Sequence, residues 1–455
     1  MFNVVMKSAL LSGGDLVKSS KYNIFIENGN NVLAYNSRTS ALAEVSYPKY
    51  DTILKILENP NNECDEKLKQ DLFYGGFLIQ DDFDELASIR HDMYRARFST
   101  EILQLTIAPT ADCNFRCPYC YEKDVLENKV MTDDVENKII SFIKSKINSI
   151  HTLSITWYGG EPLLESKRID RMSEQIIEIC NEHGVNYDAG IITNGYLLTR
   201  KNFLMLVKNK VKTIQITLDG TEETHDKRRY LKDGGKTFSK IIDNLYALVD
   251  IYKEKKEELP RINVRINTDR NNKDEAFGLL KYISNSPLSK FIALDIAAVY
   301  DPADVEHLYT LTLEEYSKVK NDFVDLCRDE GFQISNTLFY PKRVNAICVC
   351  DRVNTGVIGP DGSVYKCWEE IGDINACIGQ VGNNTVLNLP ERYYDYMLFD
   401  PTLSEQCSNC NILPICMGGG CPLRRSRDKV KNCELQMKNI TSSILKSYQL
   451  ITSSN

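Results

Sequence analysis

Three cysteines on one short loop are the residues of this chain best suited to redox chemistry. Cys113, Cys117 and Cys120 are spaced C-x3-C-x2-C and follow an apolar, strand-like run from Leu103 to Ala108. Three thiolates on one loop can bind three irons of a cubane cluster and leave the fourth iron open. An open coordination position lets a metal bind a substrate-like molecule. The alternatives are unrelated buried cysteines or a zinc site, which favours four ligands, whereas no fourth ligand lies near this loop.

The distribution of all 15 cysteines also favours metal over disulfides. We find no signal-peptide layout at the N-terminus, so a disulfide framework is not expected. Beyond the loop, nine cysteines lie between Cys348 and Cys433, whereas Cys180 and Cys327 fall in phase with apolar helix positions. We expect these last two to be buried as small hydrophobes.

Length and charge exclude several classes of function. The chain has 455 residues, enough for two to four domains, and a net charge of −8. An acidic balance disfavours nucleic acid or an anionic membrane as a partner. No apolar run of about 18 residues occurs, so we expect no transmembrane helix and a cytoplasmic protein.

The central part of the chain alternates strand-like runs with amphipathic helices, the pattern of a parallel sheet with crossover helices. The helices are expected at Thr132–Ile147, Ser166–Cys180 and Phe238–Tyr252. The candidate strands are Leu103–Pro109, Ser154–Tyr158, Ala189–Thr193, Thr213–Leu218, Ile262–Asn267 and Phe291–Ala298. Because the carboxyl ends of parallel strands open onto the catalytic side of such folds, the residues that follow each strand are the candidates for a site.

Short polar and glycine-rich segments follow three of these strands. They are Gly159-Gly160-Glu161-Pro162, Thr193-Asn194-Gly195 and Thr217-Leu218-Asp219-Gly220, and His225-Asp226-Lys227-Arg228-Arg229 comes next. Glycines let the backbone approach a ligand closely. Each polar residue taken alone could be a turn former or a helix N-cap. Their ordered succession indicates a cofactor site instead.

The C-terminal cysteines form a second pattern. Cys350-x11-Gly362-x4-Cys367 is followed by Cys407-x2-Cys410-x5-Cys416-x4-Cys421 and then by Cys433. A zinc ribbon on Cys407 and Cys410 is the alternative. Eight or nine thiols gathered in one region fit iron–sulfur clusters better.

Together these motifs resemble the radical S-adenosylmethionine (SAM) enzymes of the SPASM subfamily. The resemblance implies a partial (β/α)6 barrel whose three-cysteine loop holds a [4Fe-4S] cluster, with SAM on the open iron and a 5′-deoxyadenosyl radical as the product of electron transfer. The residues that it assigns to SAM are Tyr119, Gly159, Gly160, Glu161, Pro162, Thr193, Asn194, Thr217, Asp219, Arg229 and Asn267.

The same resemblance implies two auxiliary [4Fe-4S] clusters, three in all. Cys350, Cys367 and Cys421 would bind the first, with Cys348 as a candidate fourth ligand. The second would be bound by Cys407, Cys410, Cys416 and Cys433. The family spacing before Cys421 is three residues and here it is four, which leaves the ligand role of Cys421 open. An open iron on the first cluster is the alternative to ligation by Cys348.

The first hundred residues resemble, in arrangement only, the winged-helix-like peptide-recognition domain of peptide-modifying radical SAM enzymes. Tyr22–Ile26 and Val32–Tyr35 read as a hairpin, followed by helical patterns from Pro48 and over Asp65–Phe73. Such domains bind a leader peptide as an added strand. The alternative is a structural lobe that caps the barrel. The expected domains are 1–98 for recognition, 99–310 for the barrel, 311–346 for a helical bridge and 347–455 for SPASM.

The layout resembles that of maturases of ribosomally made peptides. We expect hydrogen abstraction from a precursor peptide and a thioether bond from a Cys sulfur to a carbon, with an external electron donor such as flavodoxin or ferredoxin. A carbon–carbon crosslinking maturase is the close alternative. Anaerobic sulfatase maturation, which makes formylglycine, is another, but those enzymes tend to carry Asp at the position of Trp368. A non-catalytic cluster protein is disfavoured by the intact cysteine loop.

Overall fold

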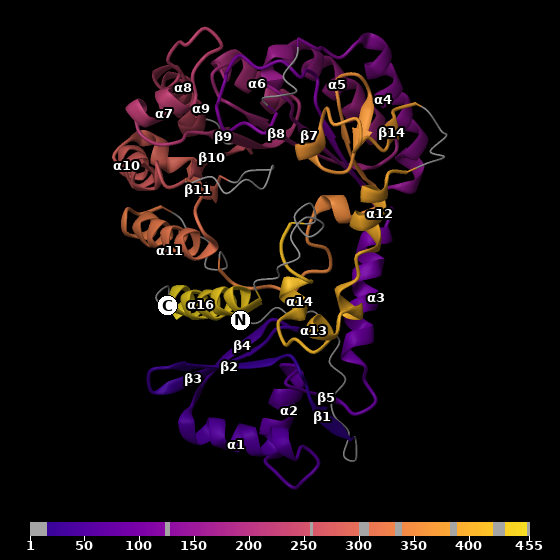
Figure 1. The fold of residues 1–455 in the computed structure, drawn as a ribbon, viewed down its shortest axis with the longest axis vertical. Coiled ribbons are helices and arrows are strands. Elements are labelled where there is room, and N and C mark those ends of the chain that lie inside the picture. The colour runs from indigo at the N-terminus through magenta and orange to yellow at the C-terminus, as the bar shows by residue number, and fades with distance from the viewer. Residues whose placement is uncertain are drawn as a thin grey trace. The chain divides into compact units, whose positions relative to one another are not determined.

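The computed structural model describes residues 16–122, 128–254, 258–299, 309–332, 339–382, 389–421 and 433–452 (Figure 1). The chain divides into two compact units, each assembled from distant segments. Unit 1 comprises Met1–Phe98, Ser335–Asp351 and Leu398–Asn455, and unit 2 comprises Ser99–Ile334 and Arg352–Met397. No helix in the described ranges has the length and apolar character needed to cross a bilayer.

Unit 2 is built on a nine-stranded, mainly parallel sheet in the order β11-β10-β9-β8-β7-β6-β12-β13-β14. Six neighbouring parallel strands match the predicted ones: β6 (Ile102–Ile107), β7 (Thr152–Trp157), β8 (Asn186–Thr193), β9 (Val211–Thr217), β10 (Arg261–Thr268) and β11 (Ile292–Ala298). A seventh parallel strand, β12 (Thr355–Ile358), pairs with β6 and was not predicted. It forms a hairpin with β13 (Ser363–Tyr365), which pairs with β14 (Gly379–Gln380).

Crossover helices connect the parallel strands, as the periodicity predicts. They are α4 (Asp133–Lys146), η1 (Ile147–Ser149), η2 (Pro162–Glu165), α5 (Ser166–Glu182), α6 (Arg200–Lys208), α7 (Glu222–Arg228), α8 (Phe238–Tyr246), α9 (Val249–Glu254), α10 (Lys273–Ser284), η3 (Pro287–Lys290) and α11 (Leu313–Asp329). The single helix expected over Phe238–Tyr252 is wrong. The backbone N–H of Leu248 bonds to the carbonyl of Leu245 in a tight turn, which separates α8 from α9.

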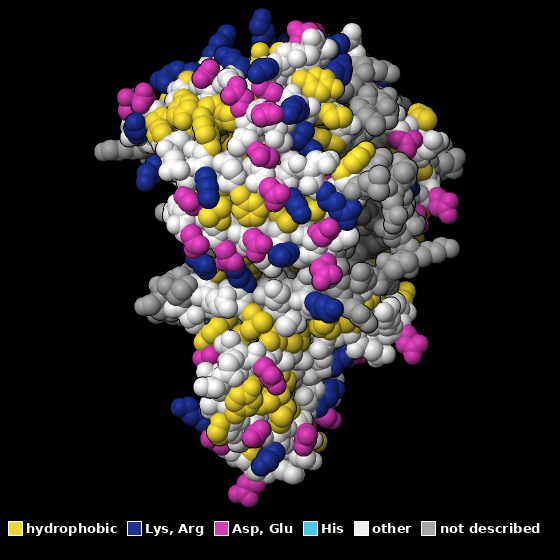
Figure 2. Space-filling view, turned by 60° about the vertical axis from the view of Figure 1, so that its left-hand side comes forward, with side chains coloured by type: hydrophobic (Ala, Val, Ile, Leu, Met, Phe, Trp, Pro, Cys, Tyr) yellow, Lys and Arg dark blue, Asp and Glu magenta, His cyan; other side chains and the backbone are white. Residues whose placement is uncertain are grey.

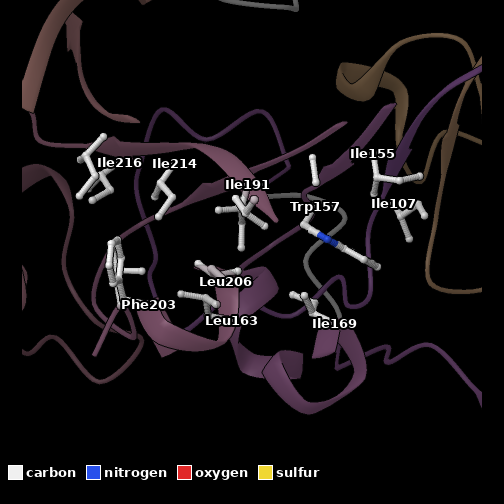
Figure 3. Close-up of a cluster of buried hydrophobic side chains, with 14 of the residues drawn as sticks. Ile107, Ile155, Trp157, Leu163, Ile169, Ile191, Phe203, Leu206, Ile214 and Ile216 are labelled. Carbon is white, nitrogen blue, oxygen red and sulfur yellow. The ribbon is translucent and has the colours of Figure 1, made fainter. Parts of the chain in front are cut away.

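The main core lies between one face of this sheet and the helices. Figure 3 shows Ile155, Trp157 and Ile191 from the strands meeting Leu163 and Ile169 from the helical segment that follows β7. The alternate strand residues, such as Ser154 and Thr156 on β7, are only half-buried on the other face. This alternation is expected for strands with two different faces. Cys180 and Cys327 belong to the core, as predicted.

Unit 1 contains a three-stranded antiparallel sheet in the order β2-β3-β4. The predicted hairpin is β2 (Asn23–Asn28) and β3 (Asn31–Asn36), and β4 (Ala41–Ser46) was not predicted. β1 (Val17–Ser19) pairs with β5 (Leu78–Gln80) in a separate ribbon. The winged-helix-like arrangement stays a prediction.

Helices complete this unit. They are α1 (Tyr47–Glu58), α2 (Glu66–Tyr74), α3 (Glu85–Phe98), α13 (Glu405–Ser408), α14 (Leu413–Cys416) and α16 (Cys433–Thr452), with short η4 (Val349–Asp351) and η6 (Pro401–Leu403). The Asp65 side chain caps α2 by accepting from the backbone of Lys67 and Leu68. Short η5 (Trp368–Glu370) belongs to unit 2, and α12 (Glu391–Leu398) ends at the boundary between the units. On the face shown in Figure 2, Lys and Arg side chains are interspersed with Asp and Glu.

Candidate active site

The three-cysteine loop leaves the carboxyl end of β6 and is anchored by its own residues. Phe115, only 1% exposed, packs edge-to-face on Tyr196 with ring centroids 5.9 Å apart. The backbone N–H of Arg116 bonds to the carbonyl of Tyr230 at 3.0 Å, and the carbonyl of Asn114 accepts from the N–H of Lys232 at 2.8 Å. The loop is therefore held against the segment that follows α7.

The thiols of Cys113, Cys117 and Cys120 are half-buried and close enough to influence one another electrostatically. Burial raises the pKa of all three, that of Cys120 to about 12. A metal must therefore displace protons from these thiols to bind them. Within the described ranges, no three His, Cys, Asp or Glu side chains are gathered as a single metal ion requires. A cubane cluster makes a different demand, because each thiolate binds a separate iron.

Gly159 and Gly160 bring the turn after β7 into contact with the backbone that leads into the cysteine loop. A Cβ on Gly160 would lie 2.2 Å from the carbonyl oxygen of Asp112, and one on Gly159 would lie 2.4 Å from that of Thr110. Gly159 also has a φ of 109°, which favours glycine. Only glycine fits these two positions, as the sequence predicts for a close backbone approach.

Glu161 joins the ends of two neighbouring strands. Its carboxylate is fully buried and accepts from Thr193 Oγ1 at 2.7 Å and from the backbone N–H of Asn194 at 2.7 Å and of Leu163 at 3.0 Å. Burial raises its pKa, although the three hydrogen bonds oppose that shift. An ionised carboxylate offers about four acceptor positions, so one more donor can be received. Pro162 begins η2 directly after it.

Asn194 connects the end of β8 to the cysteine loop. Its Nδ2 group donates to Asn114 Oδ1 at 2.8 Å and points at Cys113 Sγ from 3.9 Å. The backbone N–H of Phe115 donates to the same sulfur at 3.3 Å. Such donors tune thiolate ligands of iron–sulfur clusters. Asn194 thus serves the cysteine loop as well as its own strand end.

A buried polar network follows β9. Asp219, fully buried, accepts from the Tyr119 hydroxyl, and Arg229 Nη1 donates to the same hydroxyl at 2.7 Å. Burial lowers the pKa of Arg229, but Cys117, Tyr119 and Asp219 more than offset this and hold it well above its usual range. Arg229 Nε is buried and has no hydrogen-bond partner among the described residues. A buried, unpaired guanidinium donor fits an anionic ligand at this position.

The two remaining residues predicted to contact SAM lie beside this network. The backbone N–H of Asn267, on β10, donates to Asp219 Oδ1 at 3.2 Å. Thr217, the last residue of β9, is buried and pairs in register with Arg265. All eleven residues predicted to contact SAM therefore lie in unit 2: ten are on the cysteine loop or near strand ends, and Arg229 caps the end of α7.

Two residues of this site were missed from the sequence. Arg228 Nη1 bonds to Asp269 at 2.8 Å, and its guanidinium lies 5.0 Å from the Tyr119 ring centroid. His225 is fully buried and accepts the backbone N–H of Asp219 on Nδ1 at 3.2 Å. Both lie in the segment from His225 to Arg229, but the His-Asp-x-x-Arg spacing assigned a SAM contact to Arg229 alone.

An aromatic stack was also missed. Tyr158, directly after β7, stacks on Trp368 with ring centroids 5.6 Å apart and an interplanar angle of 25°. Burial raises the Tyr158 pKa well above its usual range, and nearby Cys120, Glu369 and Cys367 contribute. The stack therefore lies near both a thiol of the cysteine loop and Cys367. Aromatic residues after strand ends are too common for the sequence to single this pair out.

In unit 1, the structure brings Cys407, Cys410, Cys416 and Cys433 together. Burial raises the pKa of Cys416 to about 11, and the negative charges of the other three thiolates act in the same direction. Gln406 Nε2 points at Cys433 Sγ from 3.4 Å, and the backbone N–H groups of Ile412 and Gly418 donate to Cys410 and Cys416. These are the four cysteines that the sequence grouped together.

The other C-terminal cysteines are divided between the units. Cys348, Cys350 and Cys421 belong to unit 1 and Cys367 to unit 2. Cys350 hydrogen-bonds to Cys348, which lowers the pKa of Cys348 to about 6. The residues between Cys416 and Cys421, Met417 to Gly420, all have positive φ, so the extra residue is accommodated in a left-handed turn. The predicted first auxiliary set stays a prediction.

The fold and the site together define an α/β protein with a three-cysteine loop at the carboxyl edge of a parallel sheet. Residues 107–270 match the model of the radical SAM superfamily, so the chain contains a radical SAM domain, and it is an enzyme.

Two relatives and one solved structure show how far the likeness extends. The cysteine-type anaerobic sulfatase-maturating enzyme of Clostridium novyi is 28% identical over 70% of this chain and 87% of its own length. The radical SAM cyclopropyl synthase TigE of Paramaledivibacter caminithermalis is 24% identical over 90% of both chains. Streptococcus suis SuiB bound to its precursor peptide SuiA is similar in fold, with a TM-score of 0.52 and 13% identity, over 91% of this chain and 97% of SuiB.

Proposed function

We propose that this protein is a maturase that binds SAM beside a [4Fe-4S] cluster on Cys113, Cys117 and Cys120 and modifies a peptide. The observation that carries the proposal is that Cys113 lies near buried Glu161, which follows β7, and Cys117 near buried Arg229, which follows α7. The carboxylate has a free acceptor position and the guanidinium a free donor. The pair suits the amino and carboxylate groups of SAM.

Residues of this chain have separate roles in positioning the groups of this site. When bound, the cluster and SAM supply a strong hydrogen-atom abstractor, which is cofactor chemistry. Gly159 and Gly160 keep side chains away from the backbone of residues 110–112, Asn194 orients the cysteine loop, and Asp219 holds Tyr119 in place. Burial of Glu161, Asp219 and Arg229 excludes water from the polar contacts.

A peptide substrate is supported by the relatives that match most of the chain. TigE and SuiB match 90% and 91% of it, and SuiB was solved with a precursor peptide. The sulfatase-maturating relative leaves 30% of the chain unmatched. We propose that the N-terminal lobe, residues 1–98, recognises a leader peptide at a free edge of the β2-β3-β4 sheet. An external donor such as flavodoxin or ferredoxin would supply electrons.

The proposed reaction is a thioether bond between a Cys sulfur and a carbon of the same peptide. Two further [4Fe-4S] clusters would assist in a SPASM domain over 347–455. Cys407, Cys410, Cys416 and Cys433 would hold one, and Cys350, Cys367 and Cys421, with Cys348, the other. Carbon–carbon bond formation is the second candidate, favoured by the likeness to a cyclopropyl synthase. Formylglycine formation is a third, favoured by the sulfatase-maturating relative. The aromatic Trp368 after Cys367 argues against it.

The test is anaerobic incubation with SAM, reductant and a short Cys-containing peptide encoded beside the gene, followed by mass spectrometry and thiol alkylation. Loss of two hydrogens with one Cys no longer alkylatable supports the thioether. The same loss with every Cys alkylatable supports carbon–carbon joining. Oxidation of a sulfatase Cys without any change to the peptide supports formylglycine formation. Failure to cleave SAM at all would contradict the whole proposal.

A further inference from the structure

The N-terminal sheet and the C-terminal cysteines are packed into one body within unit 1. Leu33 and Tyr35 on β3 are fully buried and belong to an apolar cluster with Ile412 and Ile444. Ile412 lies within residues 407–417, which we call the cysteine segment, and Ile444 lies on α16. Cys410 and Cys416 pack against the same cluster. The central strand of the proposed recognition lobe is therefore in the apolar environment of two thiols.

The opposite face of the same strand serves a different purpose. Val32 and Ala34 belong to a separate cluster with Ile53 on α1 and Leu68 on α2. Successive side chains of a strand point to opposite faces, so Leu33 and Val32 lie on different sides of the sheet. The first face covers the cysteine segment, and the second forms the lobe's own core.

A neighbouring set of contacts surrounds the thiol of Cys407. Cys407 is buried with Tyr22, Met93, Leu413 and Met417 in a neighbouring apolar cluster, which joins the residue before β2, α3 and the cysteine segment. Tyr22, which directly precedes β2, is fully buried. Two of the thiols thus pack with the β2-β3-β4 sheet and a third with the residue that leads into it.

Hydrogen bonds fix the loops of the lobe to the same segment. Ser37 Oγ donates to the carbonyl of Asn411, and Lys21 Nζ to that of Ser408 at 2.7 Å. These two acceptors flank Cys410 in the sequence. Any movement of the cysteine segment must therefore break contacts made by the lobe.

We propose that the β2-β3-β4 sheet is a wall of the iron–sulfur site formed by Cys407, Cys410, Cys416 and Cys433, and that this cluster and the recognition lobe stabilise each other. The inference rests on the proposed auxiliary cluster at these cysteines. An apolar wall controls the access of water and of chelators to a cluster. The binding energy of a metal site is also folding energy for the segments that form it.

This coupling has a consequence for peptide recognition. Linkage between two sites is reciprocal. If the bound cluster stabilises the folded lobe, the folded lobe stabilises the bound cluster by the same free energy. A leader peptide added to an edge of this sheet would bind more tightly to protein that holds the cluster than to protein that lacks it. The iron–sulfur site would then ensure that only loaded enzyme engages its substrate.

The first experiment compares two neighbouring residues of one strand in full-length, reconstituted protein. Under anaerobic conditions, the rate at which a ferrous chelator removes iron is measured for the wild type, Leu33→Ala and Val32→Ala. We expect Leu33→Ala to release one cluster's share of the iron about tenfold faster, the scale typical of groups that support metal ligands. Val32→Ala is the matched control and should release iron at the wild-type rate. Equal rates in both variants would overturn the proposal; if Leu33→Ala does not fold, Leu33→Val replaces it.

The second experiment measures the effect of the cluster on the lobe. Hydrogen exchange of residues 22–46 is followed by mass spectrometry in Cys410→Ser/Cys416→Ser and, as control, in Cys113→Ser/Cys117→Ser. We expect faster exchange in the first double variant alone. Unchanged exchange with reduced iron would overturn the coupling but leave the auxiliary site intact. Unchanged iron would instead contradict the auxiliary site itself, and SAM cleavage tests the radical site independently of both.

Discussion

Thr193 Oγ1 donates a hydrogen bond to Glu161 Oε1 over 2.7 Å and thereby ties the end of β8 to the turn after β7. Both groups are buried, and the same carboxylate also accepts two backbone N–H groups. A buried carboxylate needs such donors, because unpaired charge is costly away from water. Two of the strand ends that carry proposed SAM contacts are therefore positioned by one side chain.

Glu161→Gln should destabilise the protein and weaken SAM binding. The amide places an NH2 group where the carboxylate accepts hydrogen bonds, so at least one buried donor loses its partner at a cost of about 1–3 kcal/mol. Glu165→Gln is the control, because among the described residues the Glu165 side chain has one partner, Arg168, in an ion pair of 3.7 Å. The measurements are unfolding by denaturant and SAM affinity by calorimetry. Equal effects in the two variants would show that the buried hydrogen bonds at Glu161 contribute little.

Cys117→Ala should abolish SAM cleavage and remove one cluster's share of iron, since the proposed cluster would lose one of its three protein ligands. Cys180→Ala is the matched control, because Cys180 is buried in the core on α5 away from the cysteine loop. The readouts are 5′-deoxyadenosine formation and iron content. Cleavage that persists in Cys117→Ala would contradict the assignment of this loop.

Gly160→Ala should displace the backbone before Cys113 and strongly reduce SAM cleavage. Its Cβ would meet backbone atoms of Ala111 and Asp112, which cannot rotate away as a side chain could. Gly356→Ala on β12 is the control, because its Cβ would meet nothing nearer than 3.4 Å. Similar activity in the two variants would mean that the turn after β7 need not approach the loop so closely.

His225 should make the protein less stable in mild acid. Burial, helped by Arg229 and Arg228, holds the pKa of His225 well below its usual 6.5. The unfolded chain therefore binds a proton that the folded one excludes, so stability present above pH 6.5 is lost as the pH falls toward the folded pKa, by at most about 1.4 kcal/mol per pH unit.

The measurement is the apparent Tm at pH 7.5 and 5.5 under one scan rate. The apparent Tm of the wild type should fall more than that of His225→Gln between these two pH values, since glutamine does not titrate. The difference between the two proteins removes other titrating groups from the comparison. A parallel fall in both would show that His225 does not govern the acid response.

Much of the fold of unit 2 was predictable because its signals are local. Alternation of buried and half-buried residues marks β6 to β10, and apolar spacing marks α4 and α5. β12 was missed, since it has only four residues and depends on pairing with β6, which is distant in the sequence. β4 was missed although it pairs with its neighbour β3. The break between α8 and α9 was missed because the apolar period continues through it.

The site was predictable where residues are neighbours in the sequence and not where they converge from afar. The cysteine loop and the Gly-Gly-Glu-Pro turn are continuous segments, so their spacing was sufficient. The roles of Arg228 and His225 depend on side chains that reach Asp269 and Asp219, and the Tyr158–Trp368 stack joins residues from distant parts of the chain.

The sequence by itself determined the ligand types, the parallel α/β pattern and the order of the motifs, because periodicity and spacing are properties of short segments. Only the tertiary structure decided that Tyr119 meets Asp219 and Arg229, and that Cys410 and Cys416 pack against a sheet made by residues 23–46. Such contacts depend on the packing of all elements at once, which a local pattern cannot encode.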